Sequence, residues 1–337
     1  VYKRQDLQSH TFHSDDKGSP EQLVTKARSL GLDFLAIKDH NTISHHAHLP
    51  DLEDHSLLLI PGQEVTTYYG HMNVWGAYRW CDFRAVTTDE MAAIIDFAYK
   101  AGGVCSINPP KTGGPAWQFD TDLDVQAMEV WQGPWPHRNL ESLALWDRLL
   151  NEGRRLPAVG GSDYHCPAQE DTNLLRLGQP TTWVHAAEYS VKGILAAIIA
   201  GRCCVSAHPL GPWLDLAARS GSSHAVMGGV LRKATEEPIT LAVQAHDAAG
   251  YRLCVVADGD LLVDPALADP LVHPLVAATH QHHPRQRSEA RRHRLVEGCA
   301  LGCQQHHRRP ILALAAHRLD GGRQRLGLED HALATPE

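Results

Sequence analysis

The first residues able to do metal chemistry lie in the stretch Asp6-Leu7-Gln8-Ser9-His10-Thr11-Phe12-His13-Ser14-Asp15. This stretch combines imidazoles, carboxylates and hydroxyls directly before the first helix signal. Because side chains alternate along a strand with a period of two, Gln8 and His10 are expected on one face. A strand end of this kind presents two neighbouring ligands to one metal ion, but only one of the two positions holds a histidine.

Further imidazoles and carboxylates follow short apolar runs that are typical of buried strands. Imidazole together with carboxylate is the ligand set of zinc, manganese or iron. For any single histidine, a hydrogen-bonded residue without metal is the ordinary interpretation. A set in which every member follows a predicted strand instead favours a metal centre, and this set comprises His10, Asp15, His40, Glu64, His71, Asp163 and His165.

The apolar runs alternate with segments of helical period. Helices are predicted over 20–30, where Ser19 and Pro20 form a start signal, and over 88–101, 140–151 and 190–200. Strands are predicted over 34–37, 57–60, 103–107, 126–131, 156–159 and 181–184. Strands that alternate with helices favour a parallel sheet, and polar residues at the strand ends favour an α/β barrel with its site at the C-terminal face. Two later runs, 239–243 and 253–256, predict a small β-rich appendage.

Net charge, hydrophobicity and cysteine spacing limit the kinds of partner and the cellular location that are expected. The 337 residues carry a formal net charge of −8, which gives no reason to expect nucleic acid or an anionic membrane as a partner. No apolar run approaches the length of a bilayer span, so the chain is expected to be soluble. The eight cysteines lack the spacing of a disulfide framework, which favours reduced thiols and a cytoplasmic location. The oligomeric state stays open.

The two ends of the chain differ from the rest. Residues 1–5 read as one frame of a sequencing adapter and are predicted to be a scar, which leaves a lost signal peptide open. Beyond about residue 265, Trp, Tyr, Phe and Lys are absent while Arg, His and Gln cluster. This part is predicted to be frameshifted or otherwise non-native, with a disordered arm as the alternative. The predicted organisation is a scar over 1–5, a barrel over 6–205, a β-rich appendage over 206–264 and an atypical tail over 265–337.

The ordered motifs of the barrel segment resemble the PHP (polymerase and histidinol phosphatase) superfamily, and most of all its CehA/McbA-like metallohydrolase branch. They are Asp6-Leu7-Gln8-Ser9-His10-Thr11 with Asp15, Ile37-Lys38-Asp39-His40-Asn41, Gly62-Gln63-Glu64, Gly70-His71 and Gly161-Ser162-Asp163-Tyr164-His165. The resemblance implies a distorted (β/α)7 TIM-like barrel with two or three divalent metal ions (Zn, Mn or Fe) at the strand C-termini. It also implies hydrolysis of a small phosphate mono- or diester, or of a carboxylic or carbamate ester.

Carried over by position, the resemblance assigns His10, Glu64 and Asp163 to a first metal. Glu64 would bridge to a second metal that also takes His71. A third metal would be held by Asp15, His40 and His165. Asp39 would orient its neighbours without binding an ion. A metal-bound hydroxide would then be the nucleophile, so that no side-chain nucleophile is needed.

Four positions depart from the family pattern. Gln8 and Pro109 stand where the family has histidines, Lys38 replaces a usual threonine and puts a cation beside the cluster, and Asp16 stands where glycine is usual. Three interpretations follow: a working enzyme with fewer metals, a pseudoenzyme that binds a ligand without turnover, or an active enzyme misread at single bases. Lys111 and His137 are candidate contacts for a substrate anion, with a solvated loop position as the ordinary interpretation.

Several other residues are expected outside the centre. His45, His46, His48 and His55 are predicted to be solvated loop residues, and Glu129 is predicted to be the buried partner of a basic neighbour. The aromatic residues Trp75, Trp117, Trp131 and Trp135 are predicted to belong to the core or to a partly apolar pocket wall.

Overall fold

The computed structural model describes residues 2–108, 111–112, 116–165, 174–233, 239–248, 252–257, 260–263, 271–279, 294–306, 309–318 and 326–328. The chain divides into two compact units, Val1–Trp213 and Leu214–Glu337. Each unit is described by itself below.

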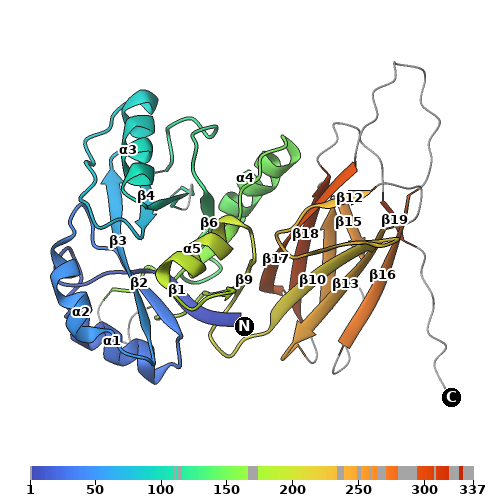
Figure 1. Ribbon diagram of the computed structural model, residues 1–337, viewed down its shortest axis with the longest axis horizontal. Coiled ribbons are helices and arrows are strands. Elements are labelled where there is room, and N and C mark those ends of the chain that lie inside the picture. Colours follow the sequence, from blue (N-terminus) through green and yellow to red (C-terminus); the bar gives the residue numbers. More distant parts are fainter. Residues whose placement is uncertain are drawn as a thin grey trace. The chain divides into compact units, whose positions relative to one another are not determined.

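The first unit is a mixed sheet that nearly closes into a barrel, with helices packed around it (Figure 1). Its nine strands lie in the order β9-β8-β1-β2-β3-β4-β5-β6-β7. The strands are β1 (Tyr2–Ser9), β2 (Phe34–Ile37), β3 (Leu58–Thr67), β4 (Gly70–Trp75), β5 (Val104–Ile107), β6 (Ala127–Gln132), β7 (Ala158–Gly161), β8 (Thr181–His185) and β9 (Cys203–Ser206). The helices are α1 (Pro20–Ser29), the short η1 (Ser44–His48) and α2 (Leu49–Leu52), α3 (Thr88–Lys100), α4 (Asn139–Asn151) and α5 (Val191–Ile199).

Strand direction corrects the prediction of a parallel sheet. The neighbours β1, β2 and β3 run parallel, as do β5, β6 and β7. By contrast, β4 is antiparallel to both of its neighbours, and β8 is antiparallel to β1 and β9. The connection from β3 to β4 is a two-residue turn, too short for the crossover that a parallel neighbour requires. The predicted α/β barrel architecture is therefore present as a mixed, barrel-like sheet.

The two ends of this sheet approach each other through side-chain and backbone contacts. In β8, the hydroxyl of Thr182 accepts a hydrogen bond from Gly160 N (2.8 Å) and donates one to Gly160 O (2.9 Å) in β7. Ser9, at the end of β1, forms a parallel bridge with Tyr164 just after β7. The end of β7 is therefore fixed directly beside the end of β1.

Two of the helices begin with capping boxes that are readable in the sequence. Ser19 accepts from Gln22 N while the Gln22 side chain accepts from Ser19 N, and Pro20 takes the first helical turn of α1. Thr87 and Glu90 make the same reciprocal pair before α3. These bonds satisfy amide groups that a helix start otherwise leaves free.

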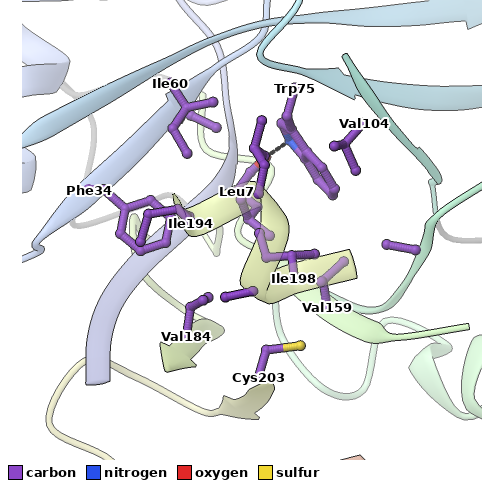
Figure 2. Close-up of a cluster of buried hydrophobic side chains, with 14 of the residues drawn as sticks. Leu7, Phe34, Ile60, Trp75, Val104, Val159, Val184, Ile194, Ile198 and Cys203 are labelled. Carbon is purple, nitrogen blue, oxygen red and sulfur yellow. Dashed lines mark hydrogen bonds between the residues drawn. The ribbon is translucent and has the colours of Figure 1, made fainter. Parts of the chain in front are cut away.

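The interior of the barrel is apolar at one end. One cluster of buried side chains takes residues from all nine strands of this sheet, which places it inside the barrel (Figure 2). Ile194 and Ile198 of α5 belong to the same cluster, so α5 covers this end of the barrel. Trp75 contributes its ring and donates a hydrogen bond to Leu7 O (3.0 Å). The polar residues at the other end of the barrel therefore lie above a packed apolar core.

The second unit is built of strands. One sheet has the order β11-β10-β13-β16-β19, and another contains β15-β14-β18-β17 with β12 paired to β17. The strands are β10 (Trp213–Ser220), β11 (Ser223–Val226), β12 (Leu231–Lys233), β13 (Ile239–His246), β14 (Arg252–Ala257), β15 (Asp260–Val263), β16 (Leu271–Thr279), β17 (Arg294–His306), β18 (Arg309–Arg318) and β19 (Leu326–Leu328). The runs expected at 239–243 and 253–256 lie within β13 and β14.

The predictions about the chain ends stay predictions. Residues 2–5 lie in β1 and pair with β8, and four strands, β16 to β19, lie beyond residue 265. The cysteines whose surroundings are described, Cys81, Cys105, Cys203 and Cys204, are buried. Within the described residues, every helix is too short or too polar to cross a lipid bilayer.

Candidate metal centre

The seven predicted ligands converge at the end of the barrel where the parallel strands finish. They leave β1, β2 and β7 at or just past the last residue of each strand, or lie within β3 and at the start of the antiparallel β4. Two overlapping groups of metal-binding side chains result. We name His10, Asp15, His40 and His165 the outer group, and His10, Glu64 and Asp163 the inner group.

Stacked imidazoles form the centre of the outer group. The His10 ring stacks against His40 (centroids 4.4 Å apart) and against His165 (4.3 Å), and the centroids of His40 and His165 are 6.1 Å apart. Asp15 Oδ1 lies 3.1 Å from His165 Nε2 and 3.5 Å from His40 Nε2. The Asp15 side chain is 58% exposed whereas His10 is fully buried, so the outer group faces solvent on the side of Asp15.

The charges of the outer group favour a carboxylate beside imidazolium. The hydrogen bond from His165 holds the pKa of Asp15 well below its usual range. Burial alone would lower the pKa of His165, but the hydrogen bond to Asp15 and the charge of Asp163 raise it to about 9. The protonated His165 thus balances the Asp15 carboxylate that it contacts.

The inner group is organised by Glu64, whose carboxylate is fully buried in β3. Lys38 donates to Glu64 Oε2 at 2.6 Å, and both side chains are essentially inaccessible. His71 Nδ1 lies 2.8 Å from Glu64 Oε1. Burial would raise the pKa of Glu64, but the Lys38 ammonium and the surrounding imidazoles hold it well below its usual range. The positive charge of Lys38, which was predicted to lie beside the cluster, is therefore present as part of a buried ion pair with Glu64.

Gln8 and His10 meet on the same carboxylate. Gln8 Nε2 donates to Asp163 Oδ1 at 3.0 Å, and His10 Nε2 lies 3.1 Å from the same oxygen. A register shift between Asp6 and Ser9 marks a bulge at this strand end. Asp163 itself has a φ of +55°, a strained conformation for a residue with a side chain, which is typical of functional sites.

The outer group fits a divalent cation. Its four candidate ligand atoms all lie within 4.8 Å of one another. Two ligands of a common zinc ion, each about 2.1 Å from it, can stand up to about 4.2 Å apart. Small side-chain adjustments would therefore bring the three imidazoles and Asp15 onto one ion, and His, His, His and carboxylate is a recognised donor set for zinc, manganese or iron.

The inner group fits a cation poorly. Glu64 Oε2 already accepts from the Lys38 ammonium and lies 3.4 Å from Gln8 Nε2. Both neighbours present hydrogens where a metal ion requires lone pairs. Lys38 and Gln8, two of the four departures from the family pattern, thus both oppose a cation in the inner group.

Asp39 supports the loop that carries Asp15. Its Oδ1 accepts from Thr11 N (2.7 Å) and Ser14 Oγ (2.6 Å), and its Oδ2 accepts from Thr11 Oγ1 (2.7 Å). Although burial acts to raise the pKa of Asp39, bonds with His45, Ser14 and Thr11 lower it to about 2. Its side chain is in neither group of candidate ligands.

His45 corrects one prediction about the histidine-rich loop. It was expected to be solvated, but it is fully buried, with Nε2 2.9 Å from Ile37 O and Nδ1 2.9 Å from Asp39 Oδ2. His46 is half-buried against Gly62 O, and burial lowers its pKa to about 4. His48 is half-buried as well, and only His55 is exposed as predicted.

The predicted substrate contacts are not brought into the cluster directly. Lys111 donates to Gln132 O and to Asn139 Oδ1, both at 3.3 Å, at one side of the site. His137 is exposed. Pro109, the second position where a histidine was expected, lies outside the described residues.

Two residues of the site were not among the predicted ones. Thr66 Oγ1 lies 2.6 Å from His40 Nδ1 and fixes the orientation of that ring. Gln132, the last residue of β6, donates to Asp163 Oδ2 at 3.1 Å. Gln132 directly follows the predicted strand 126–131 and could have been found by that position, whereas Thr66 is a hydroxyl within a strand and gives no such indication.

Glu129 corrects another prediction. It is fully buried in β6, but neither of its carboxylate oxygens has a hydrogen-bond partner among the described residues. Burial raises the pKa of Glu129 well above its usual range, which favours the neutral acid. A basic partner was predicted for Glu129, but the nearby Lys38 is bonded to Glu64 instead.

The tryptophans divide between core and surface. Trp75 and Trp131 are buried core residues, which excludes them from a solvent-facing pocket wall. Trp135 packs edge-on against Trp131, and Trp117 packs edge-on against Phe119. Both Trp117 and Trp135 are partly exposed.

Gly161 leaves room for the side chains of Gln8 and Glu129 beside the metal-binding groups. A Cβ added at this position would overlap Gln8 Cβ and lie 2.6 Å from Glu129 Oε1. We expect Gly161→Ala to lower the free energy of unfolding by about 1–3 kcal/mol, because overpacking must displace Gln8 or Glu129. Urea unfolding followed by tryptophan fluorescence measures this change, and an unaltered midpoint would contradict the close packing.

No family model matches the chain, and no curated protein does. Among solved structures, a two-domain protein from Bacteroides vulgatus that contains a predicted PHP-like metal-dependent phosphoesterase is similar over 82% of this chain and 86% of its own, with 19% identity and a TM-score of 0.48. Endonuclease Q, in complex with a 27-mer duplex that has an abasic lesion, is similar over 62% of this chain and 61% of its own (15% identity, TM-score 0.46). The lesion-specific endonuclease of Pyrococcus furiosus is similar over 59% and 56% (14% identity, TM-score 0.43).

These comparisons correct the expectation about nucleic acid. The acidic balance was taken to give no reason to expect a nucleic-acid partner, yet two of the similar structures are endonucleases, one of them with a duplex substrate whose lesion lies at its active site. That expectation was wrong, because net charge describes the whole chain and not the surface around one site. The geometry of the cluster carries the proposals that follow.

Proposed function

We propose that the chain is a metal-dependent hydrolase that cleaves a phosphate mono- or diester, or a related ester, at the outer group. The observation that carries the proposal is the convergence of His10, His40, His165 and Asp15 at a solvent-facing barrel end, with their ligand atoms within 4.8 Å. A bound divalent ion would polarise the ester and lower the pKa of water at the site. The ion would be zinc, manganese or iron, given the donor set.

The residues of the chain would position the substrate and balance its charge. His165 would give up its proton to bind the ion, because a metal ligand must offer a lone pair, and the positive charge of the ion would then lie next to the exposed Asp15. Lys111 lies at the side of Asp163 and would add a second positive charge toward an anionic ester. Thr66 and Asp39 would hold His40 and the loop of Asp15 in place.

The assignment of the barrel type and of the family branch is part of the same proposal. We infer a distorted (β/α)7 barrel of the PHP superfamily, in its CehA/McbA-like branch. The support is the order of the motifs in the sequence together with the barrel-like sheet that gathers them at one end. The substrate would be a small phosphoester or ester, with duplex DNA retained in the test.

Chelation and metal reloading test the proposal. We expect the chelator-treated protein to be inactive toward bis(p-nitrophenyl) phosphate, p-nitrophenyl phosphate, p-nitrophenyl acetate and an abasic duplex. Activity toward at least one should return with Zn²⁺ or Mn²⁺, because the outer group is the proposed cation site. Asp15→Ala should remain inactive after reloading, and Asp51→Ala, at an exposed position of α2, should behave as the unmodified protein.

A second candidate function is a binding module that retains the fold without turnover. The Lys38–Glu64 pair favours it, since a fixed cation lies inside the cluster. Metal binding without hydrolysis of any member of the substrate panel would support this candidate. Rescue of hydrolysis by Gln8→His with Pro109→His would then indicate that lost ligands are the cause.

A further inference from the structure

The Lys38 side chain is fully buried inside the barrel, where it contacts Glu64. Lys38 follows β2 and reaches Glu64 in the neighbouring β3, where its ammonium lies 2.6 Å from Oε2. A Cβ at Gly62 would lie 3.1 Å from Lys38 Cβ, so the glycine leaves room for the lysine stem. Both partners of the ion pair are inaccessible, with exposures of 0% and 1%.

The oxygens of Glu64 are already occupied by groups of this chain. Oε2 accepts from Lys38 and lies 3.4 Å from Gln8 Nε2 and from His10 Nε2. Oε1 lies 2.8 Å from His71 Nδ1. A cation in the inner group would have to displace these contacts and would face a buried ammonium of the same sign, which repels it.

The charge balance of the cluster leaves room for one divalent cation. Once His165 is neutral, as a metal ligand must be, the three negative charges of Asp15, Glu64 and Asp163 are opposed by the one positive charge of Lys38. The remaining two negative charges equal those that one divalent ion neutralises. The outer group, which has no contact with Lys38 among the described interactions, keeps its full set of four ligands.

We propose that this chain binds a single divalent cation, in the outer group, and that the buried Lys38 ammonium takes the charge-balancing place of a second cation beside Glu64. The inference rests on the proposed function, because it assumes that the outer group binds a metal. It goes further by assigning the stoichiometry and the residue that sets it.

Metal content measured on the full chain tests the inference without reference to activity. The protein is stripped with chelator, loaded with Zn²⁺, dialysed and analysed by plasma mass spectrometry, with calorimetry for the number of sites. We expect one ion per chain in the unmodified protein. Gln8→His with Lys38→Met should raise the content to two, because both groups that oppose a cation in the inner group are then removed.

Two variants locate the ion. Lys38→Met with Glu64→Gln removes both charges of the pair and should retain one ion, whereas Asp15→Asn should retain almost none. Lys192→Met, at an exposed position of α5, is the matched control and should retain one ion. The opposite pattern, with the ion lost from the first variant and kept in Asp15→Asn, would overturn the assignment to the outer group.

The outcomes separate this inference from the proposed function. Two tightly bound ions in the unmodified protein would overturn the inference and leave a metal-dependent hydrolase intact. No bound ion would overturn both. A folded Gln8→His, Lys38→Met protein that still binds one ion would refute the role of Lys38, and the content of the unmodified protein decides the stoichiometry even if that variant does not fold.

Discussion

Lys38→Met is expected to lower the free energy of unfolding of the metal-free protein by about 3–5 kcal/mol, the cost of leaving one member of a buried ion pair alone. Glu64 is 1% exposed, so water cannot replace the ammonium that lies 2.6 Å from it. Methionine fills much of the volume of the lysine stem, which limits any contribution from a cavity. Urea unfolding in the presence of chelator measures the loss.

Two comparisons show whether the loss comes from the unpaired charge. Lys38→Met with Glu64→Gln should be clearly more stable than Lys38→Met, because no buried charge is then left alone. Excess Zn²⁺ should also stabilise Lys38→Met more than the unmodified protein, because an ion could then take the place of the ammonium beside Glu64. A ligand that binds only the folded state adds about 2.7 kcal/mol at 100 times its Kd. Equal stability of both variants, with no added effect of Zn²⁺, would contradict this account.

The parts of the fold that follow from local sequence could be predicted. Capping boxes at Ser19 and Thr87 mark the starts of α1 and α3, and the apolar runs mark the buried strands. The direction of β4 could not be predicted with the same tools. It depends on the two-residue turn at Tyr68 and Tyr69, where an antiparallel return replaces the helical crossover.

Much of the candidate site was visible for a similar reason. Parallel strands that end at the same edge bring their following residues together, so His10, His40 and Asp163 could be grouped without a structure. The burial and the interaction partners of individual side chains could not be predicted in this way. His45 belongs to a polar, histidine-rich run that resembles a solvated loop, but it packs against Asp39 inside the protein. Which carboxylate receives Lys38 depends on three-dimensional distance, and this decides that Glu64 is paired while Glu129 is left alone.

Asp39→Asn is expected to weaken metal binding at the outer group by about 10- to 100-fold, the usual effect of changing a residue that orients metal ligands. Asp39 accepts hydrogen bonds from Thr11 and Ser14, in the loop that leads to Asp15. Asparagine has one acceptor oxygen in place of two and no negative charge, which weakens the hydrogen bonds that hold the loop. The loop must then shift, and the carboxylate of Asp15 moves away from His40 and His165.

The control for this change is Asp33→Asn. Asp33 accepts from Arg4 N at 2.8 Å and pairs with Lys3, but it precedes β2 and lies at the other end of that strand from the site. Competition calorimetry with a chelator of known affinity gives the Zn²⁺ dissociation constants of both variants. We expect Asp33→Asn to bind as the unmodified protein does. Equal affinity of Asp39→Asn would mean that Asp15 keeps its position without Asp39, and that the outer group is held together by the stacked imidazoles alone.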